Sequence, residues 1–327
     1  MTHAPVQPTE LHLEAARRVV ADYLVPTPTA TISLRGRPVY AKLEIFQPTG
    51  AFKVRGALAA IDASLKTDPT GAVIASSAGN HGLGVAHAAT LLGARATVVV
   101  PATASAAKVN KLQQYDIELI QHGESYDDAQ AFALALADER SIHFVSPFND
   151  PDVVAGQSTV FDEMLLQAPD LEHLIVSVGG GGLISGCLVS RDAHHRTDIA
   201  VTAVQPVNSS ALYFALQGKK MAEITHLPTI ADGLAGGGDD GAITNEIVAR
   251  HGVPFVLVPE AQIRYAVREA VEQNGLVMEG SATASYAAIT EDLINDRDRR
   301  VGFIVCGRNI SFDLLQTLLN EPVSHAN

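Results

Sequence analysis

Three short stretches of the sequence combine residue types that could carry out chemistry on a small anionic ligand. The first, TGAFKVRGA at 49–57, places Lys53 between apolar neighbours at the start of a predicted helix. Lysine is seldom buried without a role, so either its stem lies along the core edge while the charge reaches water, or its amine reacts. A helix N-terminus disfavours an ammonium, which helps to generate the neutral amine that a Schiff base requires.

The second stretch, SVGGGGLISG at 177–186, links an apolar strand to the start of a helix. Glycines let backbone amides approach an anion without obstruction by Cβ atoms, and a helix N-terminus adds unpaired N–H groups. The run therefore predicts a phosphate site, with a flexible tight turn as the alternative. It matches neither the dinucleotide-binding glycine pattern nor a P-loop, so a phosphate is indicated but not clearly a nucleotide.

The third stretch, ASSAGNHGLG at 75–84, is another loop between a strand and a helix. Its amides and Ser77 could hold a carboxylate, or Ser77 or Asn80 could simply cap the helix. Further on, VCGRNIS at 305–311 offers Cys306 either as a small buried apolar residue or as a partner for a heterocycle nitrogen. Together the stretches require a ligand with a phosphate, a carbonyl for Lys53 and a ring, and pyridoxal 5′-phosphate (PLP) fits all three.

Alternating strands and helices are predicted to position these stretches. Many predicted strands are continuous Val, Ile and Ala runs, such as ATVVVP and HLIVSV, which is typical of parallel sheets covered on both faces. No Pro- or Ser-rich linker separates two halves, so the domains are expected to be intertwined. Helices are expected at 10–23, 54–66, about 104–115, 125–139 and after Asn309, and further strands at 39–46 and 143–148.

Composition narrows the class of protein. The 327 residues are 47% hydrophobic and 18% charged, which is typical of a globular protein with a substantial core. A net charge of −13 opposes non-specific binding to nucleic acid. The stretch MTHAPVQPTELHLEAARRVV lacks the apolar core of a signal peptide, so we expect none. No apolar run approaches roughly 18 residues, and two cysteines indicate a reducing compartment. We therefore expect a cytoplasmic protein with neither nucleic acid nor membrane as a partner.

Five motifs in order carry a family resemblance. TGAFKVRGA, SSAGNHGLGVA, VVAGQSTV, GGGGLISG and CGRNIS resemble the PLP-dependent β-family, fold type II, and within it the serine/threonine dehydratase and serine racemase group. The resemblance spans about residues 10–315. It implies an α/β homodimer whose subunits have two intertwined domains, each with a mostly parallel open sheet covered by helices. The small domain, 48–150, would be inserted between 1–47 and 151–327 of the large, PLP-binding domain.

The resemblance also implies roles for single residues. Lys53 would be the catalytic residue that forms the Schiff base, Phe52 would pack on the cofactor ring, Asn80 would bind the ring hydroxyl, and Cys306 would face the pyridine nitrogen. The phosphate would be held by Gly179, Gly180, Gly181, Gly182 and Leu183. The carboxylate of a small amino-acid substrate would be held by Ser77, Ala78, Gly79, Asn80 and His81.

The activity implied is β-elimination of a 3-hydroxy amino acid, such as threonine or serine, to a 2-oxo acid and ammonia. Racemases of the group usually carry a serine base where this chain has Ala78, which counts against racemisation. The alternatives are an amino-acid racemase and a dehydratase of a bulkier substrate such as hydroxyaspartate or phenylserine. Relatives that perform β-replacement usually have Thr at the position of His81, and an intact Lys53 speaks against a non-enzymatic binding protein.

Other positions also depart from the pattern of the family, among them Ala51, which replaces the serine of the usual Ser-Phe-Lys motif. Gln205 stands where some members have an acidic ligand for a divalent cation, so we expect no metal. Glu279 keeps the acid of a Glu-Pro-Ser/Thr segment whose neighbour is changed, and its role is left open. Arg308 replaces a glycine and could be a surface residue or contact a substrate acid.

Overall fold

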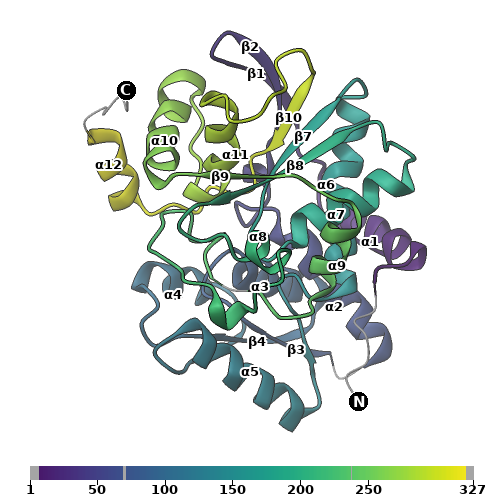
Figure 1. The fold of residues 1–327 in the computed structure, drawn as a ribbon. Helices are drawn as coiled ribbons and strands as arrows, with labels where there is room; N and C mark the ends of the chain where they lie inside the picture. The colour runs from purple at the N-terminus through teal and green to yellow at the C-terminus, as the bar shows by residue number, and fades with distance from the viewer. Residues whose placement is uncertain (1–6, 69–70, 237, 322–327) are drawn as a thin grey trace.

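The structure, a computed structural model that describes residues 7–68, 71–236 and 238–321, contains two sheets with helices packed on them (Figure 1). The strands are β1 (Thr29–Leu34), β2 (Arg37–Lys42), β3 (Ala72–Ser76), β4 (Arg95–Val100), β5 (Glu118–Gln121), β6 (His143–Phe144), β7 (His173–Ser177), β8 (Ala200–Pro206), β9 (Phe255–Val258) and β10 (Val301–Ile304). The helices are α1 (Glu10–Tyr23), α2 (Lys53–Thr67), α3 (Asn80–Leu92), α4 (Ala106–Leu112), α5 (Tyr126–Arg140), α6 (Pro151–Gln167), α7 (Gly182–Ala193), α8 (Ala211–Ala215), α9 (Ile243–Arg250), α10 (Glu260–Asn274), α11 (Gly280–Thr290) and α12 (Phe312–Asn320), with 3₁₀ turns η1 (Glu44–Phe46) and η2 (Met221–Glu223).

The larger sheet has six strands in the order β1-β2-β10-β7-β8-β9. The β1–β2 pair is antiparallel, and the pairs from β2 to β9 are all parallel. Helix α11 contacts β7, β8, β9 and β10, while α7 contacts β7 and packs against α6 and α9. In Figure 1 these two groups of helices lie on opposite sides of the sheet. The mostly parallel α/β architecture predicted from the sequence is thereby confirmed.

The smaller sheet has four parallel strands in the order β5-β4-β3-β6 and lies in the lower half of Figure 1. Helix α5 contacts β3, β4 and β6, while α3 contacts β3 and β4. Its strands all fall between residues 72 and 144, inside the range 48–150. The exact division of the chain into domains stays a prediction.

Helix α2, which begins at Lys53, packs between the two parts of the molecule against α3, α1 and α6. Its neighbours approach very closely because they present glycines. A Cβ on Gly156 of α6 would lie 2.5 Å from the carbonyl oxygen of Arg55, and one on Gly84 of α3 would lie 3.1 Å from the backbone of Lys53. The first turn of α2 is therefore fixed by backbone contacts on two sides.

A buried ion cluster anchors the same turn. The Arg55 guanidinium has no exposed surface and donates to both oxygens of Glu44, at 2.8 Å each, and to Glu163 at 2.7 and 2.8 Å. Lys42, also fully buried, donates to Glu163 at 2.7 Å and to the carbonyl oxygen of Thr27 at 2.6 Å. Two positive and two negative side chains thus neutralise one another between α2, α6, β2 and η1.

The structure differs from the sequence predictions near the N-terminus. The segment after α1, for which no strand was predicted, contains strand β1, which pairs with β2 through a turn at Arg35 and Gly36 with φ of +49° and +81°. Two consecutive positive φ values are typical of a tight hairpin turn. The strand predicted at 39–46 ends at Lys42, because Glu44 turns inward in η1 to reach Arg55.

Two other predicted elements are shorter than expected. Helix α4 covers Ala106–Leu112 rather than about 104–115, and β6 covers only His143–Phe144 of the predicted strand. After β6 the chain must end its pairing, since Pro147 has no N–H to donate. Helix α6 then begins at Pro151, where Asp150 accepts hydrogen bonds from the amides of Asp152 and Val153.

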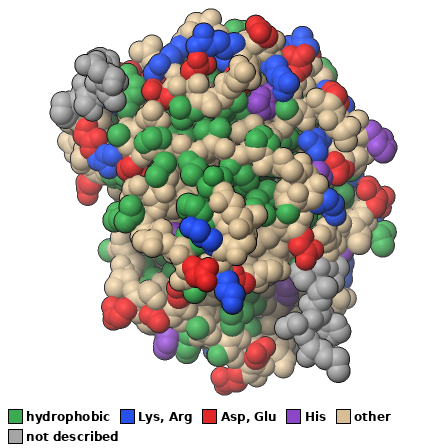
Figure 2. Space-filling view, viewed as in Figure 1, with side chains coloured by type: hydrophobic (Ala, Val, Ile, Leu, Met, Phe, Trp, Pro, Cys, Tyr) green, Lys and Arg blue, Asp and Glu red, His purple; other side chains and the backbone are tan. Residues whose placement is uncertain are grey.

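The visible surface carries both apolar and charged side chains. Among the described residues no helix has the length and apolar content needed to cross a bilayer. In Figure 2 apolar side chains gather across the middle of the visible face, while lysine and arginine side chains gather near its upper edge.

Candidate active site

The predicted site residues lie at the carboxyl ends of parallel strands and at the N-termini of the helices that follow. Ser77–Gly79 follow β3 and precede α3, residues 179–181 follow β7 and precede α7, and Cys306 follows β10. Lys53 is the first residue of α2. In parallel α/β sheets, ligands bind at the carboxyl ends of the strands. Here the predicted site residues follow strands of both sheets, β3 in the smaller one and β7 and β10 in the larger one.

The Lys53 amine lies in the middle of this arrangement. Its Nζ donates to the carbonyl oxygen of Pro147 at 2.9 Å and stands 5.3 Å from the centre of the Phe52 ring. Burial lowers the pKa of Lys53 to about 8. At neutral pH a useful fraction of the amine is therefore unprotonated, so the lysine is poised for chemistry rather than for contact with water.

The glycine loop meets the lysine through Pro147 and Phe148. A Cβ on Gly182 would lie 3.2 Å from the Pro147 oxygen that accepts from Lys53, and one on Gly180 would lie 2.4 Å from the Phe148 ring. Gly181 has φ of +90° and caps α7 without a side-chain hydrogen bond. The space beside these residues is filled by protein, so the loop can only be built from glycine.

The same loop leaves its amides available. Within the described ranges, no hydrogen bond joins the amides of Gly180, Gly181 or Gly182 to another protein group. The carbonyl oxygen of Gly180, by contrast, is held by the protein, because it accepts a hydrogen bond from Thr244 Oγ1 at 2.7 Å. Free amides at the N-terminus of α7, beside a lysine of lowered pKa, fit a group that carries both a phosphate and a carbonyl.

A Gly180→Ala change should weaken binding of PLP about tenfold or more. The added methyl would overlap the Phe148 ring, and overpacking of this kind costs about 1–3 kcal/mol, so the loop must move away from the position at which it is predicted to bind phosphate. Equilibrium titration with PLP measures the effect. A second change, Phe148→Ala, should recover part of the affinity by removing the ring. An unchanged dissociation constant in Gly180→Ala would exclude this loop from the phosphate site.

Cys306 lies beside the lysine segment. Its carbonyl oxygen accepts from the amide of Phe52 at 3.1 Å, and Ala51 pairs with Gly307 in an isolated bridge. Burial raises the pKa of the Cys306 thiol well above its usual range, so the sulfur is uncharged at physiological pH. A buried thiol held against the lysine segment is compatible with a place next to a ring nitrogen.

The loop after β3 does not cap its helix in the way that one alternative assumed. Helix α3 is capped by Gly79 without a side-chain hydrogen bond, while Ser77 Oγ accepts from the Gly79 amide at 3.1 Å. Asn80 instead points its amide at Glu279, with Nδ2 donating to Oε1 at 2.7 Å. The Asn80 side chain is thus directed toward Glu279, which directly precedes α11 on the larger sheet.

His81 is buried, and its Nε2 donates to the carbonyl oxygen of Val145 at 2.8 Å. Burial, with a further contribution from the charge on Lys53, lowers the pKa of His81 to about 3. The ring is therefore neutral, and a substrate carboxylate here would meet backbone amides rather than an imidazolium.

Sequence reasoning missed several residues that shape the site. Pro147 and Phe148 were read as part of a strand, and Thr244 carried no motif. Asn309 was noticed only as part of a turn, yet it donates to Asn80 Oδ1 at 2.7 Å and to the Thr49 oxygen at 2.8 Å. The available signal was the place of this asparagine in the chain. It lies in the turn after a buried strand, three residues after Cys306, which was already assigned to the site.

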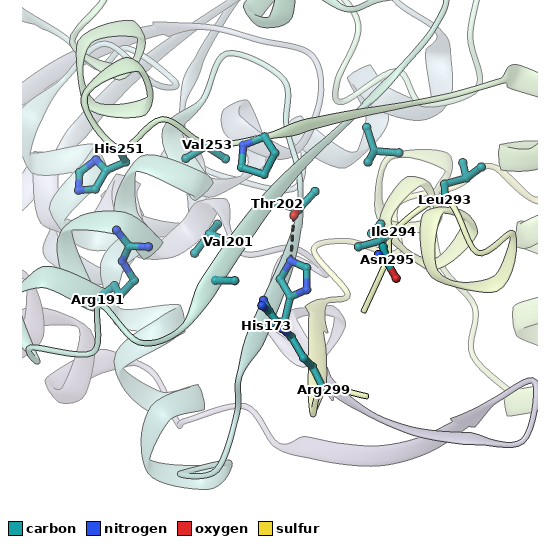
Figure 3. A pocket seen from close by; sticks show the side chains of 13 residues that line it. His173, Arg191, Val201, Thr202, His251, Val253, Leu293, Ile294, Asn295 and Arg299 are labelled. Atoms are coloured by element: carbon teal, nitrogen blue, oxygen red, sulfur yellow. Dashed lines mark hydrogen bonds between the residues drawn. The ribbon is translucent and has the colours of Figure 1, made fainter. Parts of the chain in front are cut away.

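A separate hollow of about 460 Å³ lies at the opposite end of the larger sheet, near the starts of β7, β8 and β9 (Figure 3). His173 and Thr202, which share a hydrogen bond of 2.8 Å, line it together with Arg191 and His251. None of the predicted site residues lines this hollow. Among the described residues no group of three or more His, Cys, Asp or Glu side chains could hold a metal ion, and the expected absence of a metal stays a prediction.

Comparison with known proteins gives consistent matches. Residues 20–307 match the family model described as "Pyridoxal-phosphate dependent enzyme". An L-threonine ammonia-lyase of Thermotoga maritima is 35% identical over 286 residues, which cover 88% of this chain and 71% of that protein. A serine racemase of Bos taurus is 34% identical over 288 residues, or 85% of this chain and 84% of that one.

Two solved structures are similar to this chain in fold. A pyridoxal 5′-phosphate-dependent aspartate racemase is 31% identical, with a TM-score of 0.85 over 94% of this chain and 98% of its own. The processed form of threonine deaminase isoform 2 from Solanum lycopersicum is 26% identical, with a TM-score of 0.86 over 96% and 89%. The chain therefore belongs to the family of pyridoxal-phosphate dependent enzymes, has the fold type II architecture, and uses PLP as its cofactor.

Proposed function

We propose that this protein is an ammonia-lyase that converts a 3-hydroxy amino acid, such as threonine or serine, to a 2-oxo acid and ammonia. The observation that carries the proposal is the Pro147 carbonyl, which joins the amine of Lys53 at 2.9 Å to the edge of the glycine loop at Gly182. It supports a site in which the Lys53 amine would lie beside the loop proposed to bind the phosphate. The similarity to L-threonine ammonia-lyases supports the choice of reaction.

Two groups of residues would bind the cofactor and move the substrate proton. PLP, when bound, withdraws electrons from the Cα of an amino-acid substrate. The amides of Gly180, Gly181 and Gly182 would hold its phosphate, and Lys53 Nζ would hold its carbonyl carbon until substrate arrives. The lysine amine, released in the neutral form that its lowered pKa favours, would then take the Cα proton as general base.

Other groups would orient the substrate and exclude side reactions. The loop from Ser77 to His81 would bind the substrate carboxylate through backbone amides at the start of α3. The Cys306 thiol stays neutral because burial raises its pKa, so it gives no negative charge to a ring nitrogen. Without a carboxylate there, prolonged storage of charge in the ring is disfavoured, which suits prompt loss of the β-hydroxyl.

The rival function is racemisation, which the similarity to serine and aspartate racemases favours. A racemase needs a proton donor and acceptor on each face of the substrate, and Ala78 supplies only a methyl group where the racemases usually carry a serine hydroxyl. Dehydration is therefore the better-supported proposal. A bulkier substrate, such as hydroxyaspartate or phenylserine, would use the same chemistry.

A substrate panel should separate these functions. Incubation with L-threonine, L-serine, hydroxyaspartate and phenylserine should release a 2-oxo acid and ammonia in equal amounts from at least one of them. From L-serine, pyruvate should exceed D-serine by at least about tenfold, because one missing general base costs about 10²–10⁴ in rate. Chiral chromatography measures both products. A predominance of D-serine would replace this proposal with racemisation.

We further propose a cytoplasmic homodimer with no nucleic-acid or membrane partner. The two buried free cysteines support the cytoplasmic location, and the net charge of −13 supports the lack of a nucleic-acid partner.

The proposed dimer interface lies on the side of α1 and α6. Three apolar residues on or next to these helices are 76–82% exposed, namely Leu11, Val25 and Leu166. A small domain at 48–150, inserted into the large one, belongs to the same proposal and is supported by the strand order of the two sheets.

A further inference from the structure

A closed set of hydrogen bonds surrounds the side chain of Asn80. Glu279 accepts from Asn80 Nδ2 at its Oε1, at 2.7 Å, and from the backbone amide of Asn309 at its Oε2, at 2.8 Å. Asn309 in turn uses both hydrogens of its side-chain amide, toward Asn80 Oδ1 at 2.7 Å and toward the Thr49 oxygen at 2.8 Å. Glu279 and Asn309 thereby contact the Asn80 side chain directly, and Thr49 is joined to it through Asn309.

These contacts allow only one orientation of the Asn80 amide. Its oxygen accepts from an N–H of Asn309, and one hydrogen of its nitrogen points to the Glu279 carboxylate. A reversed amide would set nitrogen against nitrogen at Asn309 and oxygen against carboxylate at Glu279. Because the amide group has two hydrogens, the observed orientation leaves one N–H as a donor for a further acceptor.

The geometry around Glu279 is tight. The residue is only 4% exposed, and a Cβ on Gly307 would lie 2.5 Å from its Oε1, so the carboxylate packs against that turn where only a glycine leaves room for it. Burial, followed by the charge of Asp232, raises the pKa of Glu279 to about 7, while the hydrogen bonds from the Asn309 amide and the Asn80 side chain act in the opposite direction. Burial of an acid costs stability, which its two donors only partly offset, and none of the reaction steps above uses this acid.

We propose that Glu279 is a positioning residue that holds the Asn80 amide with one N–H directed at the ring oxygen of the cofactor. The inference rests on the proposed contact between Asn80 and the ring hydroxyl. Asn309 completes the arrangement by fixing the Asn80 oxygen. The carboxylate is required because both of its donors need an acceptor, and a neutral amide in its place offers only one oxygen.

A double-mutant cycle on the holoenzyme tests this directly. Glu279→Gln should raise the dissociation constant for PLP about tenfold and shift the absorption band of the bound cofactor, as should Asn80→Ala. If Glu279 acts through Asn80, the double variant should be no worse than Asn80→Ala alone. Glu269→Gln is the matched control, since Glu269 on α10 is also buried, at 9% exposure, but lies outside this set of contacts. It should change neither the affinity nor the spectrum.

Asn309→Ala provides a second route if Glu279→Gln folds poorly, and its effect should likewise vanish in the Asn80→Ala background. Additive losses in both cycles would mean that Glu279 and Asn309 act independently of Asn80, which overturns the inference. If Asn80→Ala alone leaves affinity and spectrum unchanged, the assignment of Asn80 is wrong and the inference falls with it. Release of 2-oxo acid, measured on the same variants, keeps that failure distinct from a failure of the proposed reaction.

Discussion

A Lys53→Ala variant should lose at least about a thousandfold in kcat/KM for the best substrate of the panel. General-base catalysis alone contributes about 10²–10⁴ in rate, and the same amine would also attach the cofactor. The variant should fold normally, because Lys53 starts α2 and its Nζ hydrogen bond goes to the Pro147 carbonyl rather than to a buried charge. Steady-state assay of 2-oxo acid release measures the loss, and unfolding in urea checks the fold.

Lys66→Ala is the matched control for that change. Lys66 lies on the same helix but is exposed and pairs with Asp62 one turn away, so its removal should leave activity within about twofold, since exposed pairs are worth at most about 1 kcal/mol. A small primary amine in the buffer should restore part of the activity of Lys53→Ala, because it can act as the missing base. A Lys53→Ala enzyme with nearly normal activity would mean that another group removes the proton.

An Arg55→Met variant should lose about 3–5 kcal/mol of unfolding free energy, because it leaves the fully buried carboxylate of Glu44 without its arginine partner, while Glu163 keeps its bond to Lys42. Burial alone would raise the pKa of Glu44, but the charge and hydrogen bonds of Arg55 lower it below its usual value. The folded pKa of Glu44 thus lies below the unfolded one, so its contribution is present above the unfolded pKa and is lost as the pH falls through the folded one.

Unfolding in urea at neutral pH measures the effect of Arg55→Met. Arg297→Met is the control, since Arg297 pairs with Asp292 at the surface, with 73% and 45% of the two side chains exposed, and should cost no more than about 1 kcal/mol. Adding Glu44→Gln to Arg55→Met should recover part of the loss by removing one buried charge. A cost for Arg55→Met similar to that of the surface control would show that the cluster contributes little to stability.

The sequence predicted those parts of the site whose residues lie close together in the chain. Lys53 stands beside its aromatic neighbour, and the four glycines from 179 to 182 stand between a strand and a helix, so each motif could be read within about ten residues. Parallel strands were also predictable, because Val- and Ile-rich runs such as β4 and β7 are largely apolar. Strand β1 was missed because prolines precede it, although its alternating pattern and the Arg35–Gly36 turn were present.

Long-range partners could not be read in the same way. Arg55 pairs with Glu163, 108 residues away, and Asn80 pairs with Glu279, 199 residues away. Asn80 and Glu279 each stood in a motif that the sequence analysis noted, but nothing in the sequence joined either of these pairs. Only the fold of α2, α3, α6 and the turn before α11 brings the partners together. The spacing of charges along a chain predicts helix surface pairs, but not which acid reaches a given base through the core.

The most direct test of the central claim is the position of the cofactor on the chain. The holoenzyme should be reduced with borohydride and digested, and the peptides analysed by mass spectrometry for a pyridoxyl group. The account predicts a single modified peptide that carries the group on Lys53, and no modification at any site in Lys53→Ala. A pyridoxyl group on another lysine, or an unmodified Lys53 in active enzyme, would contradict it.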